Sequence, residues 1–126
     1  MKIIYLAHPI GAPTKEGIEA NLADLRRIVR FINLNYHDVV PFVPYYADIV
    51  SMDDNIPTER EKGIKNDKSI LESGIVNELW LTGDRISDGM IAEQHIAWIE
   101  MIPVIDMIGK IFVKIRAVSG FARSPP

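Results

Sequence analysis

The chain has 126 residues, of which 48% are hydrophobic and 25% are charged, and its formal net charge is −3 at pH 7. This length supports one domain with one core, and the composition is that of a globular protein. The charge excludes the basic surface that duplex DNA or an anionic membrane requires, and the absence of cysteine excludes disulfides and thiolate metal sites. No apolar run reaches the length of a signal-peptide core or a membrane span, so we expect a cytoplasmic protein.

The first predicted unit is a strand, a loop and a helix. Lys2–Ala7 is apolar after its first residue, which indicates a central parallel strand covered on both faces. The next six residues hold two prolines and a glycine and predict a loop. Thr14 is a candidate N-cap for the helix that follows. Apolar residues recur in that helix every three or four positions, at Ile18, Leu22, Leu25, Val29 and Ile32.

The middle of the chain is less regular. Asp38–Pro44 predicts a short second strand that a proline closes. Tyr45–Pro57 has no clear period and predicts a long loop, of a length that is usually functional or mobile. Its aromatic residues, Tyr45 and Tyr46, either stack on a flat ligand or pack the loop against the core. Thr58–Ser73 predicts a charged helix that opens on an approximate capping box and presents a solvated face.

Three further apolar segments predict strands, at Ile75–Leu81, Ile102–Ile108 and Ile111–Ile115. Because strands alternate with helices, the predicted fold is a three-layer α/β/α sandwich with a mostly parallel, doubly wound sheet of four or five strands. We expect this single domain to span residues 1–115 and residues 116–126 to form a flexible tail.

A second helix-start signal follows the Ile75–Leu81 strand. Ser87 and Asp88 are both good N-cap residues, so the helix is predicted to begin at Gly89 or Met90. Glu93 then lies in the first turn or just past it, at the sheet edge where open α/β sheets bind ligands. We expect the helix N-terminus to favour its ionised form, which suits a nucleophile or a base. The alternative is an ordinary acidic residue that only complements the helix dipole.

Taken together, these motifs resemble a known family. Three segments carry the resemblance: Tyr5-Leu6-Ala7-His8-Pro9, Asn66-Asp67 and Ser87-Asp88-Gly89-Met90-Ile91-Ala92-Glu93. In this order and spacing they are similar to the nucleoside 2-deoxyribosyltransferase superfamily, which includes deoxyribosyltransferases and deoxynucleoside-monophosphate N-glycosidases. The resemblance implies an enzyme that cleaves or exchanges the N-glycosidic bond of a 2′-deoxynucleoside or its 5′-monophosphate.

The resemblance also implies roles for individual residues. Glu93 would be the nucleophile at the anomeric carbon, Tyr5 would orient it, and Asp67 would help protonate the departing base. The substrate would contact a further set of residues: Ala7, His8, Gly11, Ser87, Asp88, Gly89 and Met90. Ser87 at six positions before Glu93 favours a 5′-phosphate, whereas the carboxylate of Asp88 favours a 5′-hydroxyl, so both substrate forms stay open.

The chemistry of glycosidic cleavage is consistent with these residue types. Positive charge builds up at the anomeric carbon, and a fixed carboxylate stabilises it or traps it covalently. The base departs more readily when an acid protonates it. Neither a metal nor another cofactor is required, and the three histidines are scattered, with His95 expected to be structural or on the surface.

The expected partners are a small nucleoside or nucleotide and further copies of this chain, rather than a nucleic acid polymer or a membrane. Members of the resembled family complete their crevice with a neighbouring subunit. Four large apolar side chains are candidates for such a contact because the core would not fully absorb them: Trp80, Trp98, Met101 and Ile102. Two alternatives remain, a module of the same fold that binds a nucleotide-derived ligand without turnover and a purely structural protein.

Overall fold

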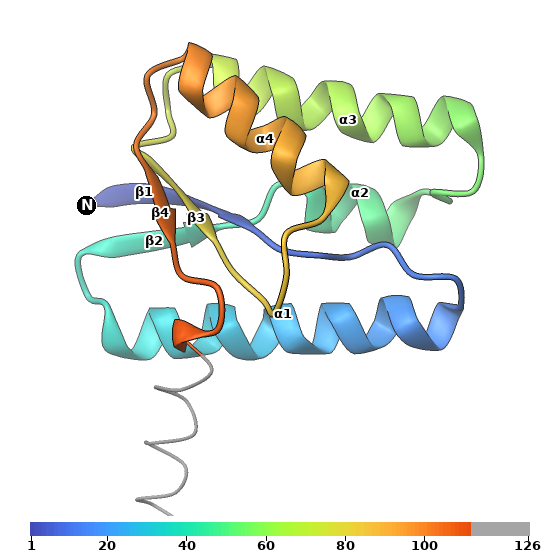
Figure 1. Ribbon diagram of the computed structural model, residues 1–126, viewed down its shortest axis with the longest axis horizontal. Coiled ribbons are helices and arrows are strands. Elements are labelled where there is room, and N and C mark those ends of the chain that lie inside the picture. The colour runs from blue at the N-terminus through green and yellow to red at the C-terminus, as the bar shows by residue number, and fades with distance from the viewer. Residues whose placement is uncertain (112–126) are drawn as a thin grey trace, which may run out of the picture.

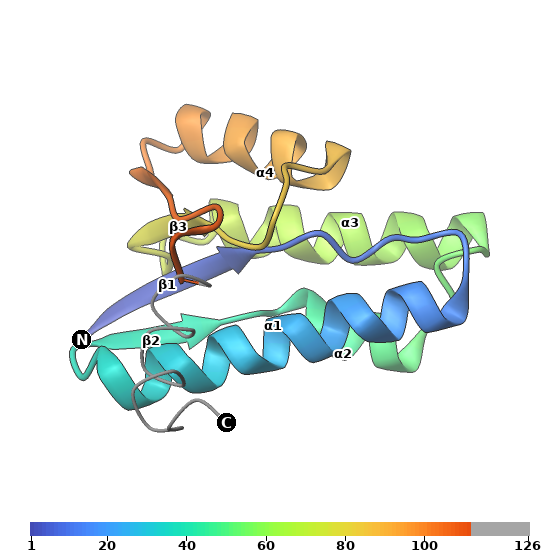
Figure 2. The ribbon, with the colours of Figure 1, turned by 60° about the horizontal axis from the view of Figure 1, so that its bottom comes forward.

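The structure is a computed structural model that describes residues 1–111, in which strands and helices alternate (Figure 1). The elements in chain order are β1 (Lys2–Ala7), α1 (Lys15–Asn35), β2 (Val39–Phe42), α2 (Tyr45–Ser51), α3 (Pro57–Glu72), β3 (Glu78–Leu81), α4 (Asp88–Ile99) and β4 (Val104–Asp106). The strands form one parallel sheet in the order β2-β1-β3-β4. Figures 1 and 2 show α1 on one side of this sheet and α3 and α4 on the other. The predicted three-layer, doubly wound α/β/α fold is therefore confirmed.

The strand order creates a topological switch point at the carboxyl ends of β1 and β3. From β1 the chain runs outward to β2 and then crosses back to β3, which pairs with the opposite side of β1. The connections after β1 and after β3 therefore leave the sheet in different directions. In open α/β sheets, ligands bind beyond the carboxyl ends of the strands at such a switch point.

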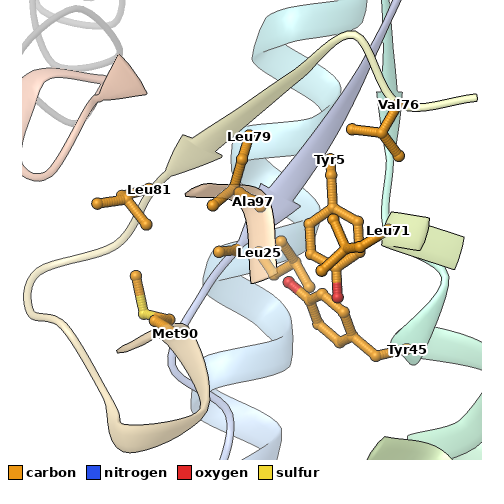
Figure 3. Packing of buried hydrophobic residues seen from close by; sticks show 10 residues of the cluster. Tyr5, Leu25, Tyr45, Leu71, Val76, Leu79, Leu81, Met90 and Ala97 are labelled. Atoms are coloured by element: carbon orange, nitrogen blue, oxygen red, sulfur yellow. The ribbon is translucent and has the colours of Figure 1, made fainter. Parts of the chain in front are cut away.

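The strand β1 is buried on both faces, as predicted. Tyr5 and Ala7 pack toward α3 and α4, in a cluster that includes Leu71, Leu79, Leu81, Met90 and Ala97 (Figure 3). Ile4 and Leu6 pack in a second cluster with Ile28, Ile32, Val39 and Trp80, on the side of α1. Because strand side chains alternate between faces, this pattern places the Tyr5 side chain in the layer that α3 and α4 cover.

The helix α1 follows its predicted pattern. The hydroxyl oxygen of Thr14 accepts a hydrogen bond from the backbone N–H of Gly17 at 3.0 Å, so Thr14 is the N-cap. Leu22, Leu25 and Ile32 are buried as predicted, Ile18 and Val29 are only partly buried, and Ile28, which the predicted period did not include, is buried instead. These side chains form the stripe that faces the sheet.

The prediction of a loop over Tyr45–Pro57 is wrong for the first half of this segment, which forms the helix α2 (Tyr45–Ser51). This helix has only seven residues, too few for a hydrophobic period to emerge from the sequence. Pro44 precedes it in the right-handed helical conformation, and Tyr45 is buried. The ring of Tyr45 lies 6.0 Å from that of Tyr5, between centroids, so Tyr45 packs into the core.

The start of α3 also differs from the prediction. The helix begins at Pro57, and its N-cap, Ile56, makes no side-chain capping bond, so the predicted capping box from Thr58 is wrong. Proline suits the first helical position because its missing N–H would have no partner inside the helix.

Three strands are shorter than predicted. β2 spans Val39–Phe42 rather than Asp38–Pro44. β3 begins at Glu78 rather than Ile75, and Gly74, with a φ of 85°, lies in the turn after α3. β4 is confined to Val104–Asp106 rather than Ile102–Ile108. The core of each predicted strand is retained, and the differences lie at the ends.

The helix α4 begins one or two residues earlier than predicted, at Asp88, because Ser87 is its N-cap. It ends at Ile99, and Met101 adopts a φ of 59° in the turn that follows. Trp80, expected to be only partly covered, is buried, and its indole N–H donates to Glu78 Oε1 at 2.9 Å.

The end of the chain can be compared with expectation only up to Ile111. Lys110 and Ile111 are helical rather than extended, which contradicts the start of a strand there. The rest of that expected strand and the expected tail over residues 116–126 lie outside the described residues. None of the helices within residues 1–111 is both long and apolar enough to cross a membrane.

Candidate active site

Tyr5 and Glu93 meet beneath α4. Tyr5 is fully buried in β1, and its hydroxyl donates a hydrogen bond to Oε2 of Glu93, a partly buried residue of α4. Glu93 is the sixth residue of α4, so it lies in the second turn rather than the first. The residues that the sequence separates by 88 positions are thus in direct contact.

Asp67 of α3 lies close to this pair. Its charge raises the pKa of Tyr5, Tyr45 and Glu93, which places the carboxyl near all three groups. The oxygen Oδ1 of Asp67 is buried and has no hydrogen-bond partner within the described residues. An unpaired buried oxygen disfavours the ionised carboxylate, because no donor replaces the water it has lost.

Both carboxyl groups hold their protons more tightly than in water. Burial raises the pKa of Glu93 to about 8, with repulsion from Asp67 adding to the effect and the Tyr5 hydrogen bond opposing it. Burial, with repulsion from Asp48, raises the pKa of Asp67 to about 7. The expectation that the helix N-terminus would favour ionised Glu93 is therefore wrong for the free site, because the dipole acts within the first turn and desolvation dominates here.

The site holds fewer than two negative charges near neutral pH. The two pKa values alone would leave the last proton on Glu93. The Tyr5 hydrogen bond opposes this on the Glu93 side, and the unpaired Oδ1 disfavours ionised Asp67 on the other. Attack by Glu93 on a sugar requires the proton on Asp67 and the charge on Glu93.

Tyr45 supports this arrangement from the side. Its hydroxyl donates to the backbone oxygen of Leu6 at 2.5 Å, and burial raises its pKa well above the usual value. The residue therefore remains neutral and ties α2 to β1. The sequence predicted a loop at Tyr45 and did not identify it as a site residue. The only sequence signal for its role was its position directly after Pro44.

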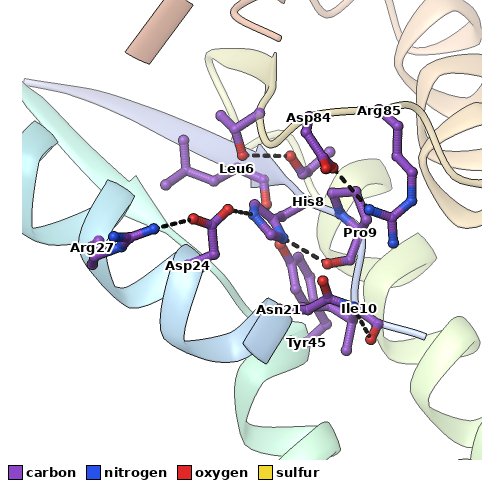
Figure 4. Close-up of polar contacts among 12 residues, drawn as sticks. Leu6, His8, Pro9, Ile10, Asn21, Asp24, Arg27, Tyr45, Asp84 and Arg85 are labelled. Atoms are coloured by element: carbon purple, nitrogen blue, oxygen red, sulfur yellow. Dashed lines mark hydrogen bonds and ion pairs between the residues drawn. The ribbon is translucent and has the colours of Figure 1, made fainter. Parts of the chain in front are cut away.

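The β1–α1 loop is held by His8. This residue is buried, and its two ring nitrogens lie 2.6 Å from the backbone oxygen of Pro9 and 2.9 Å from Oδ2 of Asp24 (Figure 4). Arg27 binds the other carboxylate oxygen of Asp24 at 2.8 Å. Both nitrogens of His8 are thus engaged by the protein, which anchors the loop on α1.

The loop between β3 and α4 approaches the β1–α1 loop. Gly83 has a φ of 96°, and a methyl group there would lie 2.7 Å from Pro9 Cδ and 3.3 Å from the ring of His8. Glycine is therefore required both by the backbone conformation and by the close approach of the two loops. The carboxyl ends of β1 and β3 are held together at this point.

The remaining expected substrate contacts lie in different environments. Ser87 is partly buried, and its hydroxyl oxygen accepts the backbone N–H of Met90 at 3.3 Å. Asp88, Gly89 and Gly11 are exposed, whereas Ala7 and Met90 are fully buried in the core cluster. Ser87 is the N-cap of α4 and Glu93 its sixth residue, so the two lie about 9 Å apart along the helix axis.

Residues 1–111 contain no group of three or more His, Asp or Glu side chains that could hold a metal ion. The donors around Tyr5 and Glu93 are hydroxyl and carboxyl groups in contact with one another rather than arranged around a common point. Their arrangement permits nucleophilic and acid–base chemistry.

Comparisons with known proteins place the chain in a wider context. Residues 2–107 match a family described as a domain of unknown function (DUF7768). No curated protein matches. Among solved structures, a 2-deoxyribosyltransferase from the psychrotolerant bacterium Bacillus psychrosaccharolyticus shares the fold with a TM-score of 0.54 and 18% identity, over 85% of this chain and 74% of that one. At this identity the likeness establishes the fold.

Proposed function

The chain belongs to the DUF7768 family, and we propose that it cleaves the N-glycosidic bond of a 2′-deoxynucleoside or its 5′-monophosphate, or exchanges the base. The observation that carries this proposal is the contact between the buried hydroxyl of Tyr5 and the Glu93 carboxyl, with Asp67 beside it. The fold shared with a 2-deoxyribosyltransferase supports the same reaction class. It lends that support as an analogy, because one fold hosts many functions.

In the first step, Glu93 attacks the anomeric carbon of the bound sugar. The bond between that carbon and the base nitrogen breaks, and its electron pair goes to the base. Asp67 transfers its proton to the base, so a neutral base departs and a glycosyl ester forms on Glu93. Tyr5 donates to the carboxylate and fixes its orientation during the attack.

In the second step, water or another base attacks the same carbon. Asp67, now ionised, accepts the proton that this nucleophile loses, and the Glu93 carboxylate leaves. Water as the acceptor gives hydrolysis, whereas a base gives exchange. Both outcomes regenerate the starting protonation of the pair, with the proton on Asp67 and the charge on Glu93.

Incubation of the pure protein with 2′-deoxynucleosides and their 5′-monophosphates, with and without a free base, tests this proposal. We expect chromatography to show a released base, and a new nucleoside where exchange occurs. Mass spectrometry of the acid-quenched reaction should show a deoxyribosyl adduct on wild type and none on Glu93→Gln. Binding of a substrate without any product would instead indicate a sensing module.

We also propose that a second copy of the chain covers the exposed side of α4. Trp98 is 77% exposed and Met101 is 89% exposed, and both were expected to be incompletely absorbed by the core. The exposed large apolar residues of α4, the turn after it and β4, together called the α4 face, are Ile91, Trp98, Ile99, Met101, Val104 and Ile105. Exposed apolar side chains that gather on one surface are typical of a site that another protein covers.

A dimer through the α4 face would bring a neighbouring subunit to the helix that carries Glu93. His95 lies on the same exposed side, with its ring stacked on that of Trp98 at 6.4 Å between centroids. A neighbour at this position would restrict solvent access to the site. Desolvation of that kind strengthens the electrostatic interactions on which the proposed chemistry depends.

A further inference from the structure

His8, the first residue after β1, has an oxygen atom within hydrogen-bond distance of each ring nitrogen. Its Nδ1 lies 2.6 Å from the backbone oxygen of Pro9, and its Nε2 lies 2.9 Å from Oδ2 of Asp24 (Figure 4). The side chain of His8 is only 2% exposed, so water does not compete for either nitrogen. The two neighbouring oxygens therefore decide where the ring carries its protons.

Both of these oxygens are acceptors. The carbonyl oxygen of Pro9 has no proton to donate, so Nδ1 must donate to it. A carboxylate likewise only accepts, and Arg27 donates to the other oxygen of Asp24 at 2.8 Å. A proton on Asp24 would weaken that charge-assisted bond. Nε2 therefore also donates, and a histidine that donates from both nitrogens is an imidazolium.

The surroundings of His8 match a positive charge. The charged and titratable groups packed around its ring come from α1, α2 and the loop between β3 and α4: Asp24, Arg27, Tyr45, Asp84 and Arg85 (Figure 4). Tyr45 stays neutral, and Asp84 and Arg85 pair with each other at 2.8 Å. The Asp24 carboxylate thus supplies the negative charge that a buried imidazolium requires.

The ring holds a loop that lies beside the candidate active site. The β1–α1 loop leaves the carboxyl end of β1, where open α/β sheets bind ligands. The amide of Asn21 donates to the backbone oxygen of Ile10 at 2.8 Å, so α1 holds this loop at a second point. Because both ring nitrogens of His8 are bonded within the protein, the ring acts on a ligand through the loop rather than by direct hydrogen bonding.

We propose that His8 is a buried imidazolium that anchors the β1–α1 loop to Asp24 and serves as a positioning residue for the substrate. Only the kinetic part of this role rests on the function proposed above. A neutral ring keeps one donor and loses its hydrogen bond to either Pro9 or Asp24. A loop that is ordered before the substrate arrives reduces the entropy lost on binding.

Nitrogen NMR spectra of the isotopically labelled protein at about pH 7, where a histidine can carry either charge, test the imidazolium directly. The chain has three histidines, so His37→Gln and His95→Gln assign the His8 signals by elimination. We expect both ring nitrogens of His8 to be protonated. An unprotonated ring nitrogen in folded wild type would overturn the proposal, and this measurement requires no substitution near the loop.

Two substitutions of Asp24 separate the charge of the ring from the anchoring of the loop. The amide of Asp24→Asn can donate to a neutral ring, so we expect one unprotonated nitrogen on His8 and an ordered loop. Asp24→Ala removes the partner, and the backbone order parameter of Ile10 should fall toward the flexible range, below about 0.6. Glu19→Ala is the matched control, because Glu19 pairs with Arg26 at 2.7 Å on the same helix. Equal order at Ile10 in Asp24→Ala and Glu19→Ala would overturn the anchor.

Turnover of a 2′-deoxynucleoside gives a separate readout. We expect Asp24→Ala to raise KM by about tenfold and to change kcat by less than about threefold, because the loop affects binding rather than the reacting groups. Asp24→Asn should restore a KM close to that of wild type, and Glu19→Ala should leave it unchanged. An unchanged KM in Asp24→Ala would overturn the positioning role. A charged ring and an ordered loop in a protein without glycosidic activity would uphold the anchor and refute the proposed function instead.

Discussion

The hydroxyl of Tyr5 donates a hydrogen bond to Oε2 of Glu93 and so joins the central strand β1 to α4. This contact has two consequences. It gives Glu93 a fixed orientation, and it stabilises the ionised carboxylate in a place where burial alone would neutralise it. Asp67 has no such donor on Oδ1, and burial raises the pKa of both carboxyl groups, to about 7 for Asp67 and about 8 for Glu93.

Glu93→Gln should abolish turnover without damaging the fold. Every route through the glycosyl-enzyme requires the carboxylate, so we expect kcat to fall by about a thousandfold or more. Ligand affinity should stay within about tenfold, since the amide keeps the shape of the side chain. Steady-state kinetics, calorimetry and thermal unfolding measure the three quantities. A Glu93→Gln protein that turns over at the wild-type rate would refute the mechanism.

Tyr5→Phe should shift the low-pH limb of the activity profile. The Tyr5 hydrogen bond lowers the pKa of Glu93, so its removal should raise that pKa and move the limb to higher pH. At pH 7 we expect a loss of about tenfold to a hundredfold in kcat/KM. Tyr46→Phe is the control, because the Tyr46 hydroxyl accepts from the exposed Arg26 at 3.3 Å instead. Equal profiles for both variants would assign Tyr5 to packing alone.

Stability should depend on pH through Asp67 and Glu93. Their carboxyl pKa values are about 7 and about 8 in the fold and about 4 in the unfolded chain, so the native state binds more protons between these limits. The free energy of unfolding therefore falls as the pH rises from about 4 to about 8. The double variant Asp67→Asn/Glu93→Gln lacks this dependence, and we expect its stability to exceed that of wild type most at about pH 9, above both folded-state pKa values.

Urea unfolding of both proteins at several pH values measures this difference. The difference in the free energy of unfolding between the two proteins should narrow steadily toward pH 4, where the wild-type carboxyls are protonated in the folded and the unfolded state. Parallel stability curves across the whole range would show that the two carboxyls are not desolvated in solution.

Ser87 and Asp88 should discriminate between a nucleoside and its monophosphate. Asp88→Asn removes a negative charge from the start of α4 and should raise relative kcat/KM for the monophosphate by about tenfold. Ser87→Ala should lower the relative kcat/KM for the monophosphate. Ser87→Thr should keep the helix cap and serves as the control. If the preference is the same in all three variants, this end of α4 does not contact the 5′ end of the substrate.

The α4 face should control assembly. We expect wild type to be a dimer or larger by size-exclusion chromatography with light scattering, and Trp98→Ser/Met101→Ser to be a monomer with reduced turnover. Leu34→Ser is the control, since Leu34 is 56% exposed on α1, away from that face. A wild-type monomer at working concentration would rule out the proposed role of the face.

Local sequence determined the helices and strands whose sequence patterns are strong and lie within a few neighbouring residues. The period of α1, its Thr14 cap and the apolar run of β1 each depend on neighbours within a few residues, and all were predicted correctly. The alternation of strands and helices was sufficient to predict the parallel, doubly wound sheet, because few topologies satisfy the right-handed crossover rule. For α4 the Ser87 signal was correct, although the helix begins one or two residues earlier than predicted and ends at Ile99.

Only the tertiary structure decided which residues meet and which face solvent. The seven-residue helix α2 is stabilised by burial of Tyr45 against Tyr5, a contact between distant segments that no local pattern contains. The sequence did not separate Trp80, which is buried, from Trp98, which is exposed, because residue type identifies an apolar side chain and not the partner that covers it. The raised pKa of Glu93 likewise follows from the buried groups around it, since desolvation depends on neighbours in space rather than in sequence.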